Sequence, residues 1–154
     1  MDDGLYKLQV IDTAAKPGLK LSNTKEFFES VDAIVLVYDI TSKSSIKHLK
    51  DFKEEINKMK LKNKNYTFIL VGNKSDDRDN RKISVDDGTK LSKEFDDHFL
   101  EVSAKDNKYI VYLFEMVIRC VNEKRLDIRR IDELERRNNS KGKNEEQQRC
   151  CFIF

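Results

Sequence analysis

Apolar residues recur along the chain in short runs that are typical of strands. Residues 6–11 alternate loosely between apolar and polar and follow a turn-forming Asp-Gly pair, which predicts a short strand. Residues 33–38 form a continuous apolar, largely β-branched run, which favours a strand buried on both faces of a parallel sheet. Residues 66–72 predict a second buried strand, and residues 99–102 predict a shorter one.

Apolar residues at helical spacing lie between and after these strands. Residues 24–31 favour a short helix, and residues 85–95 favour another. Ser44 offers an N-cap to an amphipathic helix between them. The apolar positions of that helix are Ile46, Leu49, Phe52, Ile56 and Met59. The last predicted helix carries the stripe Ile110, Leu113, Phe114, Val117, Ile118 and Val121. Strands that alternate with helices predict a doubly wound α/β sheet in a three-layer sandwich.

Length and charge limit the possible organisation. The chain has 154 residues and 38% hydrophobic content, which suits one domain. Apolar density falls after residue 121, so we expect a folded domain over residues 1–121, a helical extension and flexible tail over residues 122–149, and a terminal signal over residues 150–154. With 30 basic and 28 acidic residues the net charge is only +2, and no nucleic acid partner is expected.

A polar segment directly after the second buried strand carries the most specific chemistry. Asn73, Lys74, Ser75 and Asp76 stand where an α/β sheet presents its ligand-binding edge. An ionised carboxylate only accepts hydrogen bonds, so Asp76 can take both the ring N–H and the exocyclic amine of guanine, a donor pair that adenine lacks. On these four residues alone, an ordinary polar loop is an equally open interpretation.

A second polar segment closes the next predicted strand. It contains Ser103, Ala104 and Lys105, and its small residues allow backbone N–H groups to approach a ligand carbonyl such as the guanine oxygen. Taken alone, a capped turn into the last helix explains this segment as well. Together the two segments predict two strand-end loops that converge on one site.

Four segments, in their order and spacing, resemble the core of Rab/Ras small GTPases: LQVIDTA, DAIVLVYDITS, VGNKSD and EVSAK. The resemblance runs from about residue 5 to residue 121. It implies a fold of the P-loop NTPase type and a guanine nucleotide, GTP or GDP, with Mg²⁺. It also implies that the residues of the two polar loops hold or buttress guanine: Asn73, Lys74, Ser75, Asp76, Ser103, Ala104 and Lys105.

The segment after the first strand departs from the family's pattern. It reads Asp12, Thr13, Ala14, Ala15 and Lys16, where the family has a nucleotide-contacting DTAGQ loop. The resemblance implies that Asp12 reaches Mg²⁺ through water. Ala15 replaces a Gly whose amide senses the γ-phosphate, and Lys16 replaces the water-orienting Gln. Lys16 cannot orient water as an amide does, so hydrolysis by the usual mechanism is not expected and no catalytic residue is assigned.

No GxxxxGK[ST] phosphate loop occurs in the sequence. The family's first strand, first helix and first switch also lack a counterpart, so the small GTPase fold is expected to be incomplete. The missing strand lies in the middle of the family's sheet. We therefore expect residues 6–11 and 33–38 to have unpaired edges or to pair directly.

Two explanations of this gap remain open. The first is a degenerate, nucleotide-free interaction module, a pseudo-GTPase, which Ala15 and Lys16 favour. The second is that the chain is part of a longer nucleotide switch whose phosphate loop lies upstream.

The terminal residues resemble a prenylation signal. As a C-a-a-X sequence, Cys151 followed by a terminal Phe154 suits geranylgeranylation and removal of residues 152–154. As the Rab-like CCxxx ending, both Cys150 and Cys151 can be prenylated. We expect a protein anchored by a lipid at the cytoplasmic face of the plasma membrane or an endomembrane. Its expected partners are effector or regulatory proteins of vesicle traffic or signalling.

Overall fold

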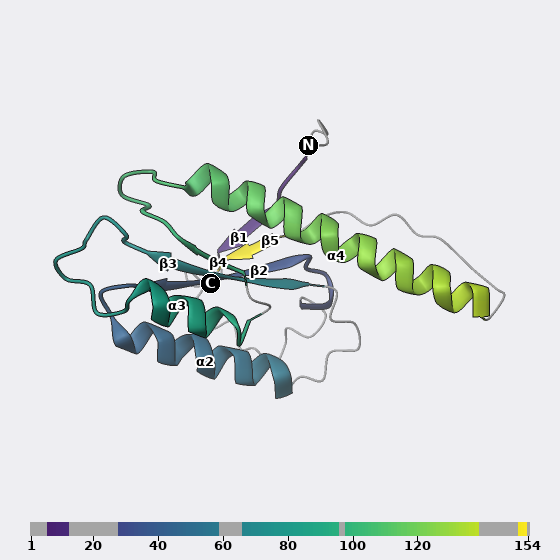
Figure 1. Ribbon diagram of the computed structural model, residues 1–154, viewed down its shortest axis with the longest axis horizontal. Coiled ribbons are helices and arrows are strands. Elements are labelled where there is room, and N and C mark those ends of the chain that lie inside the picture. Colours follow the sequence, from purple (N-terminus) through teal and green to yellow (C-terminus); the bar gives the residue numbers. More distant parts are fainter. Residues whose placement is uncertain (1–5, 13–27, 59–65, 96–97, 139–150, 154) are drawn as a thin grey trace.

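The computed structural model describes residues 6–12, 28–58, 66–95, 98–138 and 151–153, and these form one α/β unit (Figure 1). Five strands make a single parallel sheet in the order β1-β5-β2-β3-β4. The strands are β1 (Val10–Asp12), β2 (Ala33–Asp39), β3 (Thr67–Asn73), β4 (Phe99–Glu101) and β5 (Cys151–Ile153). The helices are α2 (Lys43–Lys58), α3 (Val85–Ser92) and α4 (Ile110–Asn138).

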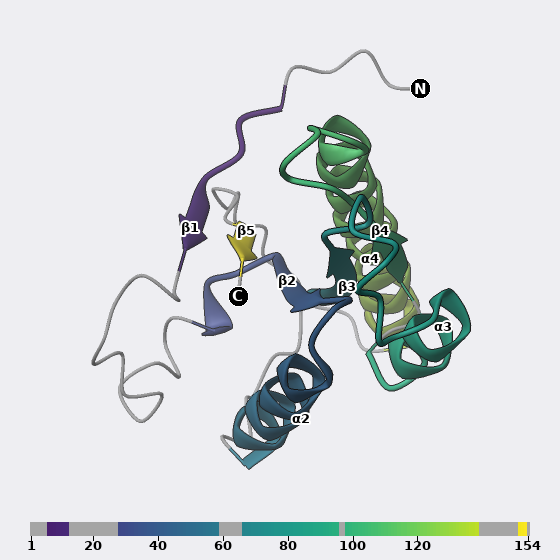
Figure 2. The same cartoon turned by 90° about the vertical axis from the view of Figure 1, so that its left-hand side faces the viewer.

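Helices cover both faces of the sheet, which gives the predicted three-layer sandwich. Helices α2 and α3 lie on one face and α4 lies on the other (Figure 2). Successive residues of a strand point to opposite faces. Ile34 and Leu36 accordingly pack in the cluster that includes residues of α2 and α3, whereas Ala33 and Val35 pack in the cluster that includes residues of α4.

The two central strands confirm the prediction from the apolar runs. Strands β2 and β3 pair in register over seven residues, from Ala33 opposite Thr67 to Asp39 opposite Asn73. Six of the seven residues of β3 are buried, because helices cover the sheet above and below them. A strand that is buried on both faces has no polar alternation, and its sequence is therefore continuous in apolar residues.

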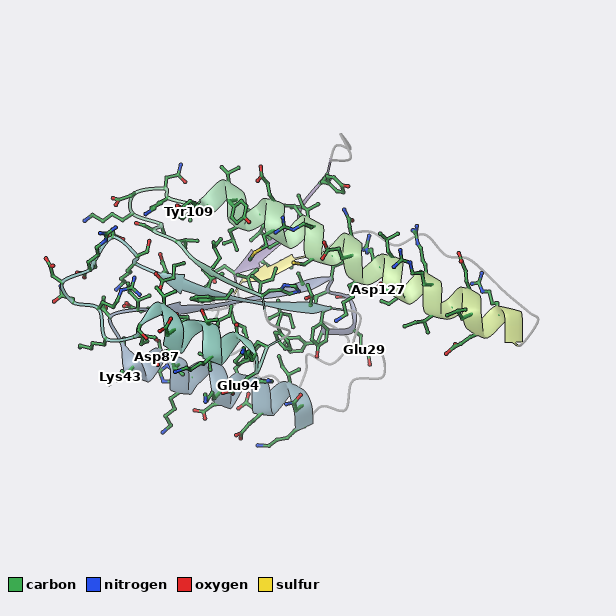
Figure 3. The ribbon with its side chains drawn as sticks, in the orientation of Figure 1. Glu29, Lys43, Asp87, Glu94, Tyr109 and Asp127 are labelled. Atoms are coloured by element: carbon green, nitrogen blue, oxygen red, sulfur yellow. The ribbon has the colours of Figure 1, made fainter. Side chains whose placement is uncertain are left out.

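The helix boundaries differ from the prediction in two places. Helix α2 begins at Lys43, so the predicted cap at Ser44 was wrong; the carbonyl of Ser42 accepts from the backbone N–H of Ser45 at 3.2 Å. Helix α3 ends at Ser92 and not at residue 95, because the backbone then tightens into turns with a bond from Phe95 N to the Ser92 carbonyl at 2.7 Å. A capping box begins α3, in which the side chains of Ser84 and Asp87 each accept from the other's backbone N–H. Asp87 is labelled in Figure 3. Of the predicted helix over residues 24–31, Phe28 and Glu29 are helical and residues 24–27 lie outside the described residues.

Helix α4 is 29 residues long and continues beyond the predicted apolar stripe. Lys124 donates to the backbone carbonyl of Tyr66, and Arg125 forms an ion pair with Asp32, so the middle of α4 is fastened to the loops that precede β3 and β2. Its last turns carry three exposed apolar side chains: Leu126, Ile131 and Leu134. Among the helices in the described part of the chain, none has the length and apolar character that crossing a bilayer requires.

The edge of the sheet around β1 corrects two predictions. The predicted strand over residues 6–11 is shorter and displaced, because β1 spans only Val10–Asp12. The expectation that β1 and β2 would have unpaired edges or would pair directly was wrong, since β5 lies between them and is parallel to both. Cys151 is in register with Val10 on one side and Ala33 on the other. Strand β5 offers only three residues for pairing, which explains why residues 6–9 form no strand.

Candidate functional site: a base pocket between two strand-end loops

The carboxyl ends of β2, β3 and β4 lie at one edge of the sheet because the strands are parallel. The loops that follow β3 and β4 enclose a pocket of about 570 Å³ at this edge. Residues from both loops line it: Asn73, Lys74, Asp76, Asp77, Ala104 and Lys105. The two polar segments that the sequence singled out are thus neighbours in space.

The side chain of Asn73 joins the two loops. Its Oδ1 accepts from the backbone N–H of Ala104 at 3.1 Å and from that of Lys74 at 2.7 Å. A backbone bond from Ser75 N to the Val102 carbonyl, at 3.0 Å, adds a second connection. Lys74 has a φ of 67°, a left-handed conformation that is uncommon for a residue other than glycine. The fixed Asn73 side chain therefore holds the first loop in a bent shape against the second.

Asp76 receives its support from the second loop. The hydroxyl of Ser103, a residue with 0% exposure, donates to Asp76 Oδ1 at 2.6 Å. Ser103 Oγ in turn accepts from the backbone N–H of Asp106 at 3.1 Å. Lys105 Nζ lies 3.8 Å from Asp76 Oδ2. The hydrogen bond from Ser103 is the main reason that the pKa of Asp76 is lowered, so the carboxylate stays ionised at neutral pH and acts as an acceptor.

Lys74 directs its charge toward the end of β2. Its Nζ lies 2.6 Å from Asp39 Oδ2, while Asp39 Oδ1 accepts from the backbone N–H and the hydroxyl of Thr41 at 2.8 and 2.7 Å. Burial raises the pKa of Asp39, but the hydrogen bonds from Lys74 and Thr41 outweigh it, and the net shift is downward. The same hydrogen bond raises the pKa of Lys74. Sequence reasoning missed Asp39; its signal is an acidic residue that follows the apolar run of β2 directly.

An ion pair braces the loop beside the pocket. Arg81 Nη1 and Nη2 lie 2.6 and 2.8 Å from the two carboxylate oxygens of Glu101, at the end of β4. Arg81 Nη1 also donates to the Ile83 carbonyl at 3.1 Å. This bidentate geometry fixes the segment that leads from the base pocket into α3.

The other predicted site residues lie apart from this pocket or outside the described residues. Asp12 is the last residue of β1, at the same edge of the sheet, and is exposed; it is not among the pocket-lining residues. Thr13, Ala14, Ala15 and Lys16 lie outside the described residues, as does Cys150. Within the described ranges, no group of three or more His, Cys, Asp or Glu side chains is arranged to hold a metal ion. Cys151 is the first residue of β5.

Comparison with known proteins agrees with this geometry. The sequence profile of the Ras family matches residues 1–123. Ras-like protein rasX of Dictyostelium discoideum is 36% identical over 124 residues, which cover 80% of this chain and 57% of that protein. Ras-related protein RabC of the same organism is 34% identical over 115 residues, or 75% of this chain and 57% of RabC. GTP-binding protein yptV2 of Volvox carteri is 36% identical over 122 residues, or 79% of this chain and 55% of yptV2.

The chain spans little more than half the length of these relatives. The match nevertheless covers most of the chain, and it includes both loops of the base pocket and strands β1 to β4 of the sheet, but not β5. The chain belongs to the Ras family of small GTPases.

Proposed function

We propose that this chain is a Rab/Ras-related, small GTPase-like protein that retains guanine recognition, has impaired GTP binding and hydrolysis, and is anchored to a membrane by prenylation. The observation that carries guanine recognition is the pair of hydrogen bonds between the two loops, Ala104 to Asn73 and Ser103 to Asp76. These bonds place a carboxylate and small-residue backbone together in one pocket before any ligand enters. Such preorganisation lowers the cost of binding.

The donor and acceptor set of the pocket suits the base half of a guanine nucleotide. The carboxylate of Asp76 would accept from the ring N–H and the exocyclic amine of guanine. The aliphatic stems of Lys74 and Lys105, which line the same pocket, can flank the base plane. Adenine offers no donor pair to the carboxylate, so the site would discriminate between the two purines.

The phosphate half of the nucleotide has weaker support. The sequence contains no GxxxxGK[ST] loop, whose backbone N–H groups and Lys would cradle the phosphates. The ammonium group of Lys74 is already paired with Asp39 at 2.6 Å. Ala15 and Lys16 stand where the family contacts the γ-phosphate and orients water. We therefore infer that the base supplies the binding energy and that GTP hydrolysis is not efficient. By the family's pattern, Asp12 is the residue that would reach Mg²⁺.

A nucleotide-free, lipid-anchored interaction module is the alternative function. The specific observation in its favour is that the polar groups of the site are paired with one another: Lys74 with Asp39, and Asp76 with Ser103. A site whose polar groups already have hydrogen-bond or ion-pair partners costs little to leave empty. On this alternative the chain would serve partners as a folded, membrane-attached surface.

The membrane anchor is proposed from the terminal sequence. Geranylgeranylation of Cys151, with or without a second lipid on Cys150, would hold the protein at the cytoplasmic face of a membrane. Each buried CH₂ contributes about 0.8 kcal/mol, and a single chain often anchors reversibly, so a second lipid would strengthen attachment. Effector or regulatory proteins of vesicle traffic or signalling are the partners that this placement favours.

Calorimetry on the purified chain tests base recognition and phosphate binding separately. Guanosine, GMP and GDP are titrated with Mg²⁺ present, and adenosine serves as the base control. If only the base is recognised, the dissociation constants of guanosine and GDP should agree within about threefold, which is a difference in binding free energy of about 0.7 kcal/mol. GDP affinity about a thousandfold above that of guanosine would contradict impaired phosphate binding. If no ligand binds, the nucleotide-free alternative stands in place of guanine recognition.

The anchor is tested by incubation with geranylgeranyl diphosphate and a protein geranylgeranyltransferase, followed by intact-mass measurement and sedimentation with liposomes. We expect one or two added lipids and co-sedimentation. Cys151→Ser should abolish modification under the C-a-a-X pattern, whereas Cys120→Ser, which alters a buried thiol of α4, should change nothing. Unmodified thiols after full incubation would refute the anchor.

A further inference from the structure

The proposed lipidation sequence also forms the strand that completes the sheet. Strand β5, Cys151–Ile153, lies between β1 and β2 and pairs with both along its whole length (Figures 1 and 2). In the register of the sheet, Phe152 lies between Ile11 of β1 and Ile34 of β2. Ile153 lies between Asp12 of β1 and Val35 of β2. Residues 151–153 are thus assigned both to an inner position of the backbone ladder, with a strand on each side, and to the sequence that the proposed lipidation would modify.

Strand β1 depends on β5 for its place in the sheet. Neighbouring strands lie about 4.8 Å apart, so β1 and β2 would be separated by about twice that distance if β5 left, too far for direct hydrogen bonds. Several side-chain contacts of the β1 segment do not involve β5: Tyr6 Oη accepts from Asn122 Nδ2 at 3.0 Å, and Leu8 and Ile11 pack against the two core clusters. Loss of β5 would therefore leave β1 attached but without backbone pairing.

The sequence and connection length suit this arrangement. Cys-Phe-Ile-Phe is an apolar run rich in strand-favouring residues, as a strand between two others requires. Residues 139–150 connect α4 to β5 and can span about 40 Å when extended. The part of α4 beyond Val121 extends only about 26 Å. The connection is therefore long enough to return from the end of α4 to the sheet.

Lipidation and strand pairing exclude each other. In prenylation, the sulfur of Cys151 forms a thioether with C1 of an allylic prenyl diphosphate, inorganic diphosphate leaves, and the thiol proton passes to solvent. The C-a-a-X pathway then hydrolyses the peptide bond between Cys151 and Phe152 with water, which removes two of the three residues of β5. A terminal peptide that is hydrogen-bonded on both sides cannot at the same time occupy the active site of a transferase.

We propose that residues 151–153 are a removable strand, which completes the sheet between β1 and β2 in the unmodified chain and is withdrawn when Cys151 is lipidated. The second half of this statement rests on the proposed lipid anchor; the first half does not. Pairing would slow lipidation by lowering the fraction of chains with an available tail. Lipidation in turn would expose the facing edges of β1 and β2, so membrane-attached and unattached forms would present different surfaces to partners.

Hydrogen exchange on the unmodified full chain tests the strand. Phe152→Pro/Ile153→Pro removes two backbone donors from β5, and Gln147→Pro/Gln148→Pro places the same two changes upstream in the tail. We expect exchange in peptides over Val10–Asp12 and Ala33–Asp39 to be at least tenfold faster in the first variant, with the control like wild type and β4 unchanged. Equal exchange in all three proteins would overturn the proposal. Protection that appears only at high protein concentration would also overturn it, because the strand would then come from a second copy.

A lipidation assay tests the exclusion with the tail sequence intact. Val10→Pro/Ile11→Pro weakens pairing from the β1 side, and Lys7→Pro, at an exposed position before β1, is the control. We expect the first variant to accept geranylgeranyl at least tenfold faster than wild type and the control to match wild type. Equal rates in all three proteins, with exchange protection present, would overturn the exclusion. Absence of modification in every protein would refute the lipid anchor and leave the strand standing on the exchange data.

Discussion

The ion pair between Arg81 and Glu101 gives a quantitative test of how the loop beside the base pocket is held. Glu101→Gln removes the negative charge and one acceptor oxygen, while the guanidinium remains where it is. Side-chain exposure is 24% for Arg81 and 15% for Glu101, between the surface and buried extremes. Surface pairs contribute about 0–1 kcal/mol, and breaking a fully buried pair costs about 3–5 kcal/mol. For this bidentate, partly buried pair we expect the free energy of unfolding to fall by about 1.5–3 kcal/mol.

Urea unfolding at pH 7, followed by circular dichroism, measures the change. The matched control is Glu94→Gln, which breaks the 3.1 Å pair with Lys50, where the two side chains are 47% and 48% exposed. Glu94 is labelled in Figure 3. The control should lose less than about 0.5 kcal/mol. A loss for Glu101→Gln no larger than that of the control would refute the reasoning that partial burial and bidentate geometry make the inner pair strong. A changed slope against urea would show that the comparison is not two-state.

Three further changes probe the core and the pocket. Burial and, as the second cause, the charge of Glu101 raise the pKa of Tyr38 from 10.0 to about 12. The neutral phenol of Tyr38 therefore contributes stability that is fully present below pH 10 and is lost as the pH rises through 12. Its hydroxyl has no hydrogen-bond partner within the described residues, so Tyr38→Phe should be near neutral at pH 7 and gain about 1 kcal/mol over wild type at pH 11 in urea unfolding. Gly88→Ala should lose about 1–2 kcal/mol in the same assay despite its helical position, because the new Cβ would lie 2.5 Å from the Phe99 ring. Asp76→Asn should weaken guanosine binding more than about tenfold in calorimetry and favour xanthosine, whose second carbonyl can accept from the new amide.

Each of these changes has a matched control in the same chain. Tyr109→Phe alters an exposed tyrosine and should leave the pH 11 difference unchanged; an equal gain there would show that the effect is not specific to burial. Thr89→Ala, next to Gly88 on the exposed side of α3, should change stability by less than about 0.5 kcal/mol. Asp79→Asn removes an exposed carboxylate that does not line the base pocket; guanosine affinity that falls equally in this variant would contradict a specific role for Asp76.

The centre of the sheet and the place of the pocket were predictable from the sequence. The apolar runs of β2 and β3 exclude any solvated face, and only a sheet covered by helices on both sides buries such runs. The polar residues that follow directly, from Asn73 to Asp76, must then lie at the carboxyl edge, because the direction of a parallel strand fixes its end. In this region the local sequence pattern and the topology of the sheet both place the polar residues at the ligand-binding edge.

The features that the sequence did not predict arise between distant segments. The Lys74 side chain lies toward Asp39 because two neighbouring strands end at the same level, which no local window shows. Strand β5 is a more extreme example. A segment of only three residues forms a strand here because it can pair with β1 on one side and β2 on the other. The local sequence does not reveal these partners, and taken alone it matches a lipidation signal. The length of β1 is set by the three residues of β5 with which it pairs. Because β5 was not predicted, the bounds of β1 were predicted wrongly as well.

The pairing of Val10 with Cys151 also sets an order of events during synthesis. At about 5–20 residues per second, the ribosome needs roughly 7–30 seconds to make the residues that separate these two partners. Helices and the central strands can form within far less than a second once their residues have emerged. During that interval the edge of β2 that pairs with β5 would have no partner from the nascent chain. A chaperone or a strand from another nascent chain could pair with this edge before β5 is synthesised.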